Sequence, residues 1–126
     1  MFTGCKSQPN EEVYISDFYN IHEEYKDAWG NVGKYEISLP YIHCDSKSAK
    51  KLNQTIKNEY KDLVDSLDEA KEEGYTLPYT KVSYDVYTHS NLLSLVIKEE
   101  VETEYPRYKV YHFDSKTKKR VSNKKL

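Results

Sequence analysis

Several residue types that support common biochemical functions are scarce in this sequence of 126 residues. It has four glycines, and none of them lies in a loop pattern that cradles phosphate groups. Only Arg107 and Arg120 among the 19 basic residues are arginine, so the planar forks that read phosphate are few. With a formal net charge of −2, the chain has no overall attraction to nucleic acid or anionic lipid. We therefore predict no nucleic-acid partner.

Neither a membrane span nor a metal site is indicated. No stretch approaches the roughly 18 consecutive apolar residues that are typical of a membrane-spanning helix. Neither Cys-x-x-Cys nor His-Glu-x-x-His occurs, and the histidines stand far apart. We interpret His112 as a partly buried, hydrogen-bonded strand residue rather than a ligand. We predict no metal, no small-molecule cofactor and no catalytic residue. The histidines are His22, His43, His89 and His112.

The two cysteines have different surroundings. Cys44 lies between a predicted strand and a predicted helix, where a small buried thiol is the ordinary interpretation. Its neighbour His43 would point to the opposite face of an extended chain, which argues against a nucleophile–base pair. A disulfide between Cys44 and Cys5 is the less favoured alternative, because Cys5 lies in a polar N-terminal segment.

Charged residues gather in two places. Four glutamates follow the most apolar predicted strand, and we interpret them as a solvated strand end, although Glu99 could reach the rim of the core. We interpret the basic residues from Lys116 onward as a soluble tail, and contact with an acidic polymer or a membrane surface is the alternative. Without interleaved aromatic residues, this tail is no nucleic-acid signature. The residues concerned are Glu99, Glu100, Glu102 and Glu104, and Lys116, Lys118, Lys119, Arg120, Lys124 and Lys125.

Tyrosine is abundant, with 13 copies against three phenylalanines and one tryptophan. A tyrosine ring packs against apolar neighbours while its hydroxyl stays hydrated, which suits a half-solvated sheet face. The same property also suits a binding surface. Of these two interpretations we favour the structural one.

Residues 45–74 predict one long amphipathic helix. Apolar residues recur at every third or fourth position, which places them on one stripe of a helix. Asp45 or Ser46 can cap the start, and Gly74 can adopt the left-handed conformation that ends a helix. We expect the helix over about 46–73. The stripe consists of Ala49, Leu52, Ile56, Tyr60, Leu63, Leu67 and Ala70.

Alternating residues before the helix predict an antiparallel hairpin. Its first strand covers 13–25, with a bulge near Asp17, where the parity of the apolar residues shifts. Its second strand covers 35–41 and has one buried face. Pro40 lacks an N–H group for the ladder, so we expect it at a sheet edge or a strand end.

After the helix, alternating segments predict a meander of three or four strands. Ser90-Asn91 indicates a tight turn, and Leu93, Leu95 and Ile97 form the most apolar strand face. The predicted fold is α+β, with the helix packed on one face of a mostly antiparallel sheet of five to six strands, ordered as hairpin, helix and meander. The strands are expected over 81–89, 93–101 and 107–113, with a short closing strand at Arg120-Val121.

The N-terminal residues resemble the end of a bacterial lipoprotein signal, in which small residues precede a cysteine that becomes diacylated. Phe2-Thr3-Gly4-Cys5 has this order, with Phe2 in place of the usual aliphatic residue, and a polar linker follows. The resemblance implies a lipid on Cys5 and an anchor at the outer face of a bacterial membrane, whereas the alternative is an ordinary thiol near a terminus. We expect a flexible tether over 1–12, one domain over 13–121 and a polar tail over 122–126.

Four segments recur, in the same order, in one bacterial module: Tyr35–Ile42, Asn53, Asn91–Ile97 and Tyr108–Lys119. Together they resemble the extracytoplasmic module of uncharacterised function found in PdaC-type deacetylases and RsiV-type anti-sigma factors. In that family a Phe-Asp-x-Lys-Thr-Gly-Lys turn opens a second module. Here Lys118 replaces the glycine and the sequence ends soon afterwards, so we expect no second module.

The resemblance implies an exported module that faces the cell wall. The deacetylases carry a separate catalytic domain and the anti-sigma factors bind lysozyme, so no catalytic residue is implied for this chain. We predict a non-catalytic, extracytoplasmic binding module of a cell-surface lipoprotein, whose partner is a lysozyme-like protein or peptidoglycan. We expect Tyr87, His89 and Tyr111 on the sheet face away from the helix to form its binding surface. The alternatives are a sensor or accessory module related to the anti-sigma factors, a small cell-wall hydrolase or deacetylase, and a spacer.

Overall fold

The computed structural model describes residues 13–122, and its one long helix, α1 (Lys47–Glu73), agrees closely with the prediction. Ser46 caps the start, because its side chain accepts a hydrogen bond from the Ala49 N–H at 3.0 Å. Gly74 ends the helix at φ 81°, and its N–H donates to the Ala70 carbonyl at 2.9 Å. Leu63 of the predicted stripe is half-buried, and the others are buried.

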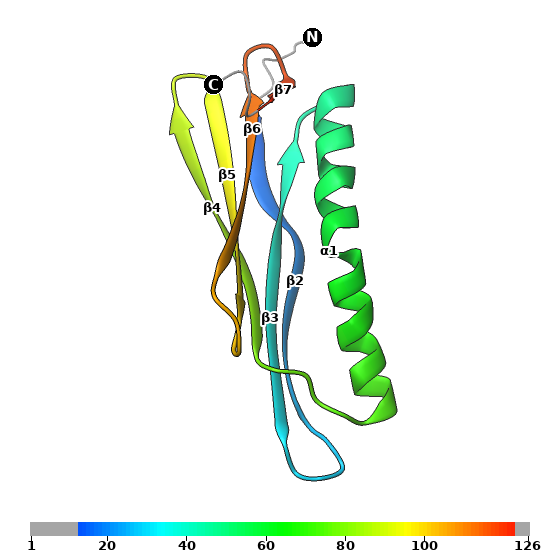
Figure 1. Ribbon diagram of the computed structural model, residues 1–126. Coiled ribbons are helices and arrows are strands. Elements are labelled where there is room, and N and C mark those ends of the chain that lie inside the picture. The colour runs from blue at the N-terminus through cyan, green and yellow to red at the C-terminus, as the bar shows by residue number, and fades with distance from the viewer. Residues whose placement is uncertain (1–12, 123–126) are drawn as a thin grey trace.

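Six strands form one sheet, as the α+β prediction requires (Figure 1). Their spatial order is the order of the chain, and every neighbouring pair is antiparallel except β3 and β4. These two are parallel because α1 connects them, returning the chain to the other end of the sheet. The strands are β2 (Tyr14–Lys26), β3 (Val32–His43), β4 (Thr80–His89), β5 (Leu92–Val101), β6 (Arg107–Asp114) and β7 (Lys119–Val121).

The core lies between α1 and one face of the sheet (Figure 1). Leu52 and Ile56 of the helix are buried against strand residues of alternating position, such as Ile37 and Leu95. The predicted apolar face of β5 is confirmed, and the turn at Ser90-Asn91 joins β4 to β5 with Ser90 at φ 54°. The helix therefore covers this face of the sheet and leaves the other to solvent.

The predicted bulge in β2 is confirmed. β2 pairs with β3 from Tyr14 to Lys26, but the register shifts between Asp17 and Tyr19, so Phe18 has no partner across the ladder. A shift of one residue exchanges the two faces of a strand. Even-numbered residues of β2 before Phe18, and odd-numbered residues after it, therefore pair with the odd-numbered residues of β3 and share their face.

β3 and β4 stay together for only part of their length. Their ladder covers Tyr35–Ile37 on β3, and the strands then diverge toward the helix start (Figure 1). Beyond the ladder, the Asn53 side chain accepts from the Ile42 N–H at 2.8 Å and donates to the Ile42 carbonyl at 3.0 Å. Pro40 lies in this unladdered part, so the expected edge position is correct locally although β3 is an internal strand.

Replacing Asn53 with alanine leaves both polar groups of the partly buried Ile42 backbone without their partner. We expect Asn53→Ala to lower the free energy of unfolding by about 1–3 kcal/mol, because a buried group that loses its hydrogen bond keeps its desolvation cost. Urea unfolding measures this change. Asn58→Ala, which removes an exposed asparagine of the same helix, is the matched control and should change stability by about 0.5 kcal/mol or less. Equal losses in both variants would contradict the role of Asn53.

Candidate functional site

The three residues expected to form a binding surface do not share one face. Tyr87 and His89 are exposed on β4, and the Tyr87 side chain is 60% accessible. Tyr111 is only 8% accessible and pairs with Leu95, so it points toward the helix. The prediction that Tyr111 lies on the face of Tyr87 is wrong. The ladders align Tyr87 with Ser94 and Ser94 with His112, so His112 shares that face and its neighbour Tyr111 lies on the opposite one.

The uncovered face of the sheet, which we call the outer face, carries Tyr87, Val96, Tyr108 and Val110. His112 also lies there, half-buried, with its Nδ1 2.8 Å from the Ser94 Oγ, as expected for a hydrogen-bonded strand histidine. Neighbouring strands hold these side chains in rows, so exposed aromatic and aliphatic groups lie side by side.

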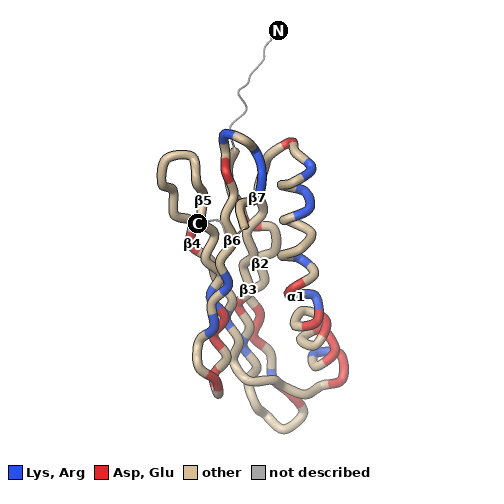
Figure 2. Tube along the Cα trace, turned by 45° about the horizontal axis from the view of Figure 1, so that its top comes forward, with Lys and Arg blue, Asp and Glu red and all other residues tan. Residues whose placement is uncertain are grey.

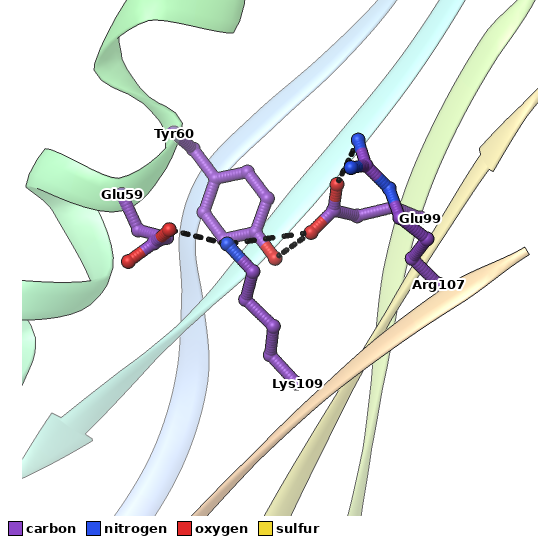
Figure 3. A network of polar contacts seen from close by, with 5 residues as sticks. All are labelled: Glu59, Tyr60, Glu99, Arg107 and Lys109. Carbon is purple, nitrogen blue, oxygen red and sulfur yellow. Dashed lines mark hydrogen bonds and ion pairs between the residues drawn. The ribbon is translucent and has the colours of Figure 1, made fainter.

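Of the four clustered glutamates, Glu99 reaches the core rim, and its side chain is 11% accessible. The Tyr60 hydroxyl donates to Glu99 Oε2 at 2.8 Å, while Arg107 and Lys109 lie 3.4 and 3.7 Å from its carboxylate (Figure 3). Lys109 also pairs with Glu59 of the helix. This network joins α1 to β5 and β6, and each partner is engaged, so we interpret it as structural. Glu102 and Glu104 are exposed, as expected for a solvated strand end.

Because of this network, the free energy of unfolding should change with pH in the alkaline range. Burial and the hydrogen bond to Glu99 raise the pKa of Tyr60 above its ordinary value of 10.0. The stabilisation is therefore complete below pH 10 and is lost as pH rises beyond it, because the unfolded chain releases the phenolic proton first. We expect Tyr60→Phe to be less stable than wild type at neutral pH, and the difference to narrow above pH 10. Urea unfolding at several pH values measures it, and a difference constant with pH would contradict it.

A groove runs between the β2–β3 hairpin and α1. It consists of two adjoining hollows of about 360 and 300 Å³, a size common in ligand sites. Phe18 and Lys57 line both, and the Lys57 Nζ lies 5.7 Å from the centre of the Phe18 ring. The further lining residues are Tyr19, Leu39, Tyr60, Lys61, Val64 and Asp65 in the first hollow, and Tyr41, Lys50, Asn53 and Gln54 in the second.

Stacked rings extend the groove along the hairpin. Phe18, which is 43% accessible, stacks on Tyr41 with ring centres 5.6 Å apart. His43 contacts Tyr41 edge-on at 4.9 Å and stacks on Tyr14 at 4.3 Å. We call Tyr14, Phe18, Tyr41 and His43 the aromatic row. Tyr14 and Ser16 pair with His43 and Tyr41, which sets this side of the hairpin, and Phe18 at the bulge stacks beside them.

The sequence reasoning missed both the groove and the aromatic row. The signal that could have found the row was the predicted bulge combined with the predicted hairpin pairing, which sets Tyr14 opposite His43. The groove additionally requires the position of α1 over β2, and no pattern in the sequence gives that position.

Ser16 and His43 form a contact that resembles part of a catalytic site, since Ser16 Oγ lies 2.6 Å from His43 Nε2. A serine nucleophile also needs the second ring nitrogen of its histidine to be oriented by an acidic group. Within residues 13–122 no carboxylate contacts the His43 ring. The contact therefore serves to fix His43 between two tyrosines.

Three further features raised by the sequence are the cysteines, a metal site and a membrane span. Cys44 is half-buried against the core, with its Sγ 3.7 Å from Ser46 Oγ, whereas Cys5 lies outside the described residues. Between residues 13 and 122, His, Cys, Asp and Glu side chains form no group of three that could hold a metal ion. No helix in the same range has the length and apolar character needed to cross a membrane.

In comparisons with known proteins, no protein-family model matches the chain, and no curated protein matches it. The groove, the aromatic row and the outer face are therefore judged by their own chemistry.

Proposed function

We propose that this chain is a non-catalytic binding module, held at the outer face of a bacterial cell membrane by a lipid on Cys5, and that its groove binds a cell-wall glycan. The observation that carries the proposal is the groove itself, with its exposed aromatic ring between amide and ammonium side chains. The resemblance of the four sequence segments to an exported, wall-facing module agrees with this location.

The lining of the groove suits a sugar polymer. A sugar ring has an apolar face of C–H groups, which packs on an aromatic ring such as Phe18 or Tyr41, and a rim of hydroxyls, which needs hydrogen-bonding partners. Gln54 and Lys50 supply such partners beside the rings. Peptidoglycan also carries carboxylates, and Lys57 faces the groove without a carboxylate partner among the described residues.

The outer face supports a second candidate, the binding of a protein such as lysozyme. It exposes Tyr87 and Tyr108, and tyrosine is enriched where proteins bind one another. This would correspond to a sensor or accessory module related to the lysozyme-binding anti-sigma factors. The two candidates use opposite faces of the sheet, so single variants separate them.

Removal of the exposed ring should weaken glycan binding. We expect Phe18→Ala to lower the affinity for purified peptidoglycan about 5-fold or more, since truncating a central aromatic contact typically costs over 1 kcal/mol. Co-sedimentation with insoluble peptidoglycan measures the affinity. Tyr108→Ala, which removes an exposed ring from the outer face, is the control and should bind as wild type does.

The same assay tests the alternatives. Lysozyme retention that falls in Tyr108→Ala but not in Phe18→Ala would favour protein binding and contradict the glycan proposal. Release of soluble fragments from peptidoglycan by the wild type, abolished in Ser16→Ala, would show a hydrolase and contradict a non-catalytic role. Equal binding by all variants would remove the groove from consideration.

The lipid anchor has its own test. When the chain is expressed in a bacterium behind a lipoprotein export signal that ends at Cys5, we expect it to incorporate a labelled fatty acid and to sediment with membranes. Cys5→Ala should lose both properties, whereas Cys44→Ala should keep them, because Cys44 is half-buried in the fold. Labelling that persists in Cys5→Ala would refute the anchor.

A further inference from the structure

Charge is distributed along α1 in the direction that the helix itself disfavours. Before Glu59 the helix carries only basic charged residues (Lys47, Lys50, Lys51 and Lys57), and its first turn has no acidic residue. From Glu59 onward the charged residues are mainly acidic. Backbone dipoles make the start of a helix partly positive, so lysines there cost helix stability rather than adding to it. A cost of this kind suggests that the positive charge serves a role outside the helix. The acidic residues are Glu59, Asp62, Asp65, Asp68, Glu69, Glu72 and Glu73.

A second basic segment lies beside the start of the helix. The turn after β6 and the strand β7 contain Lys116, Lys118, Lys119 and Arg120, and the Arg120 N–H donates to Ser48 Oγ at 2.7 Å. Figure 2 shows the basic residues of both segments at one end of the molecule and the acidic part of α1 toward the other. We call residues 45–51 and 114–121 together the basic end.

The basic end has a clear excess of positive charge. Its two segments contain seven basic and two acidic residues. Asp45 lies 3.7 Å from Lys50, and Asp114 Oδ1 accepts the Lys116 and Thr117 N–H groups, so this carboxylate is held inside the turn. The formal charge of −2 for the whole chain therefore conceals a strongly uneven distribution.

The chain enters the fold at this same end. Tyr14, at the start of β2, pairs with His43, which lies just before the helix cap Ser46. The eight residue steps from Cys5 to Val13 span at most about 28 Å, at ~3.5 Å per residue. The 27 residues of α1 place the acidic end about 40 Å farther away, at ~1.5 Å per residue. A lipid on Cys5 would therefore bring the basic end, rather than the acidic end, to the membrane.

We propose that the basic end docks on an anionic phospholipid surface, so that the domain stands on the membrane with its acidic end outward. That a membrane lies beside the domain rests on the proposed function, but the contact of the basic end with lipid does not require a lipid on Cys5. Lysines near an anionic surface attract it within a Debye length of about 8 Å, so several of them must approach it together. The shared placement of the helix start and β7 allows this. Docking fixes the orientation of the groove relative to the wall.

Vesicle sedimentation of the purified, unlipidated protein tests the docking. We expect binding to vesicles that contain phosphatidylglycerol, no binding to pure phosphatidylcholine vesicles, and weaker binding as salt is raised. The triple variant Lys47→Gln, Lys51→Gln and Lys119→Gln should bind at least about 10-fold more weakly. A matched triple variant, Lys26→Gln, Lys34→Gln and Lys81→Gln, removes the same charge from the rest of the sheet and should bind as wild type does. Thermal unfolding checks that both variants are folded.

Three results would overturn the proposal. They are equal binding to both vesicle types, equal losses in the two triple variants, and binding to soluble polyglycerol phosphate without binding to vesicles. The last result would assign the basic end to an anionic wall polymer. The test is independent of the lipid anchor, because vesicle binding can succeed when fatty-acid labelling of Cys5 fails. It is also independent of the groove, because the basic-end variants leave Phe18 and Lys57 unchanged.

Discussion

Much of this architecture depends on the two hydrogen bonds between the Asn53 amide and the backbone of Ile42. A strand that leaves its neighbour in the middle of a sheet exposes one N–H and one C=O at every second residue, and each needs a partner. Asn53 provides both for Ile42, and the prolyl ring of Pro40 has no N–H to satisfy. β3 can therefore separate from β4 and approach the helix. The groove at the hairpin and the free edge of β4 follow from this separation.

Much of the fold could be predicted because its local patterns agree with its tertiary structure. The stripe of α1 and its caps gave the helix within one residue, and the parity shift near Asp17 gave the bulge. Tyr111 shows where such reasoning ends. Alternation separates a strand into two faces but does not say which face meets the core, and both faces of β6 carry a tyrosine. The register of β6 against β5, which pairs Tyr111 with the buried Leu95, determines that Tyr111 faces the core, and this register depends on long-range packing.

The candidate sites were less accessible to prediction for a related reason. The rim position of Glu99 follows from its parity with neighbouring strand residues, but the sequence favoured a solvated strand end and gave the rim only as an alternative. The groove joins residues from β2, β3 and α1 that lie far apart in the sequence, so it exists only once the helix is placed. The basic end likewise combines the start of α1 with the last strand, β7, which lies far from it in the sequence. The C-terminal lysines were visible as a tail, but their proximity to the helix start was not.

The bulge at Phe18 has a consequence for how this surface can change during evolution. Because it inserts one residue into β2, even-numbered residues before it and odd-numbered residues after it face the same side of the hairpin. Loss of Phe18 would join Asp17 directly to Tyr19, and their partners Pro40 and Leu39 are already adjacent on β3, so the ladder would become regular and Tyr14 would stay opposite His43. Such a deletion would remove from the aromatic row the one ring that lines both hollows of the groove. The pairing of the hairpin is therefore independent of the extra residue, whereas the lining of the groove is not.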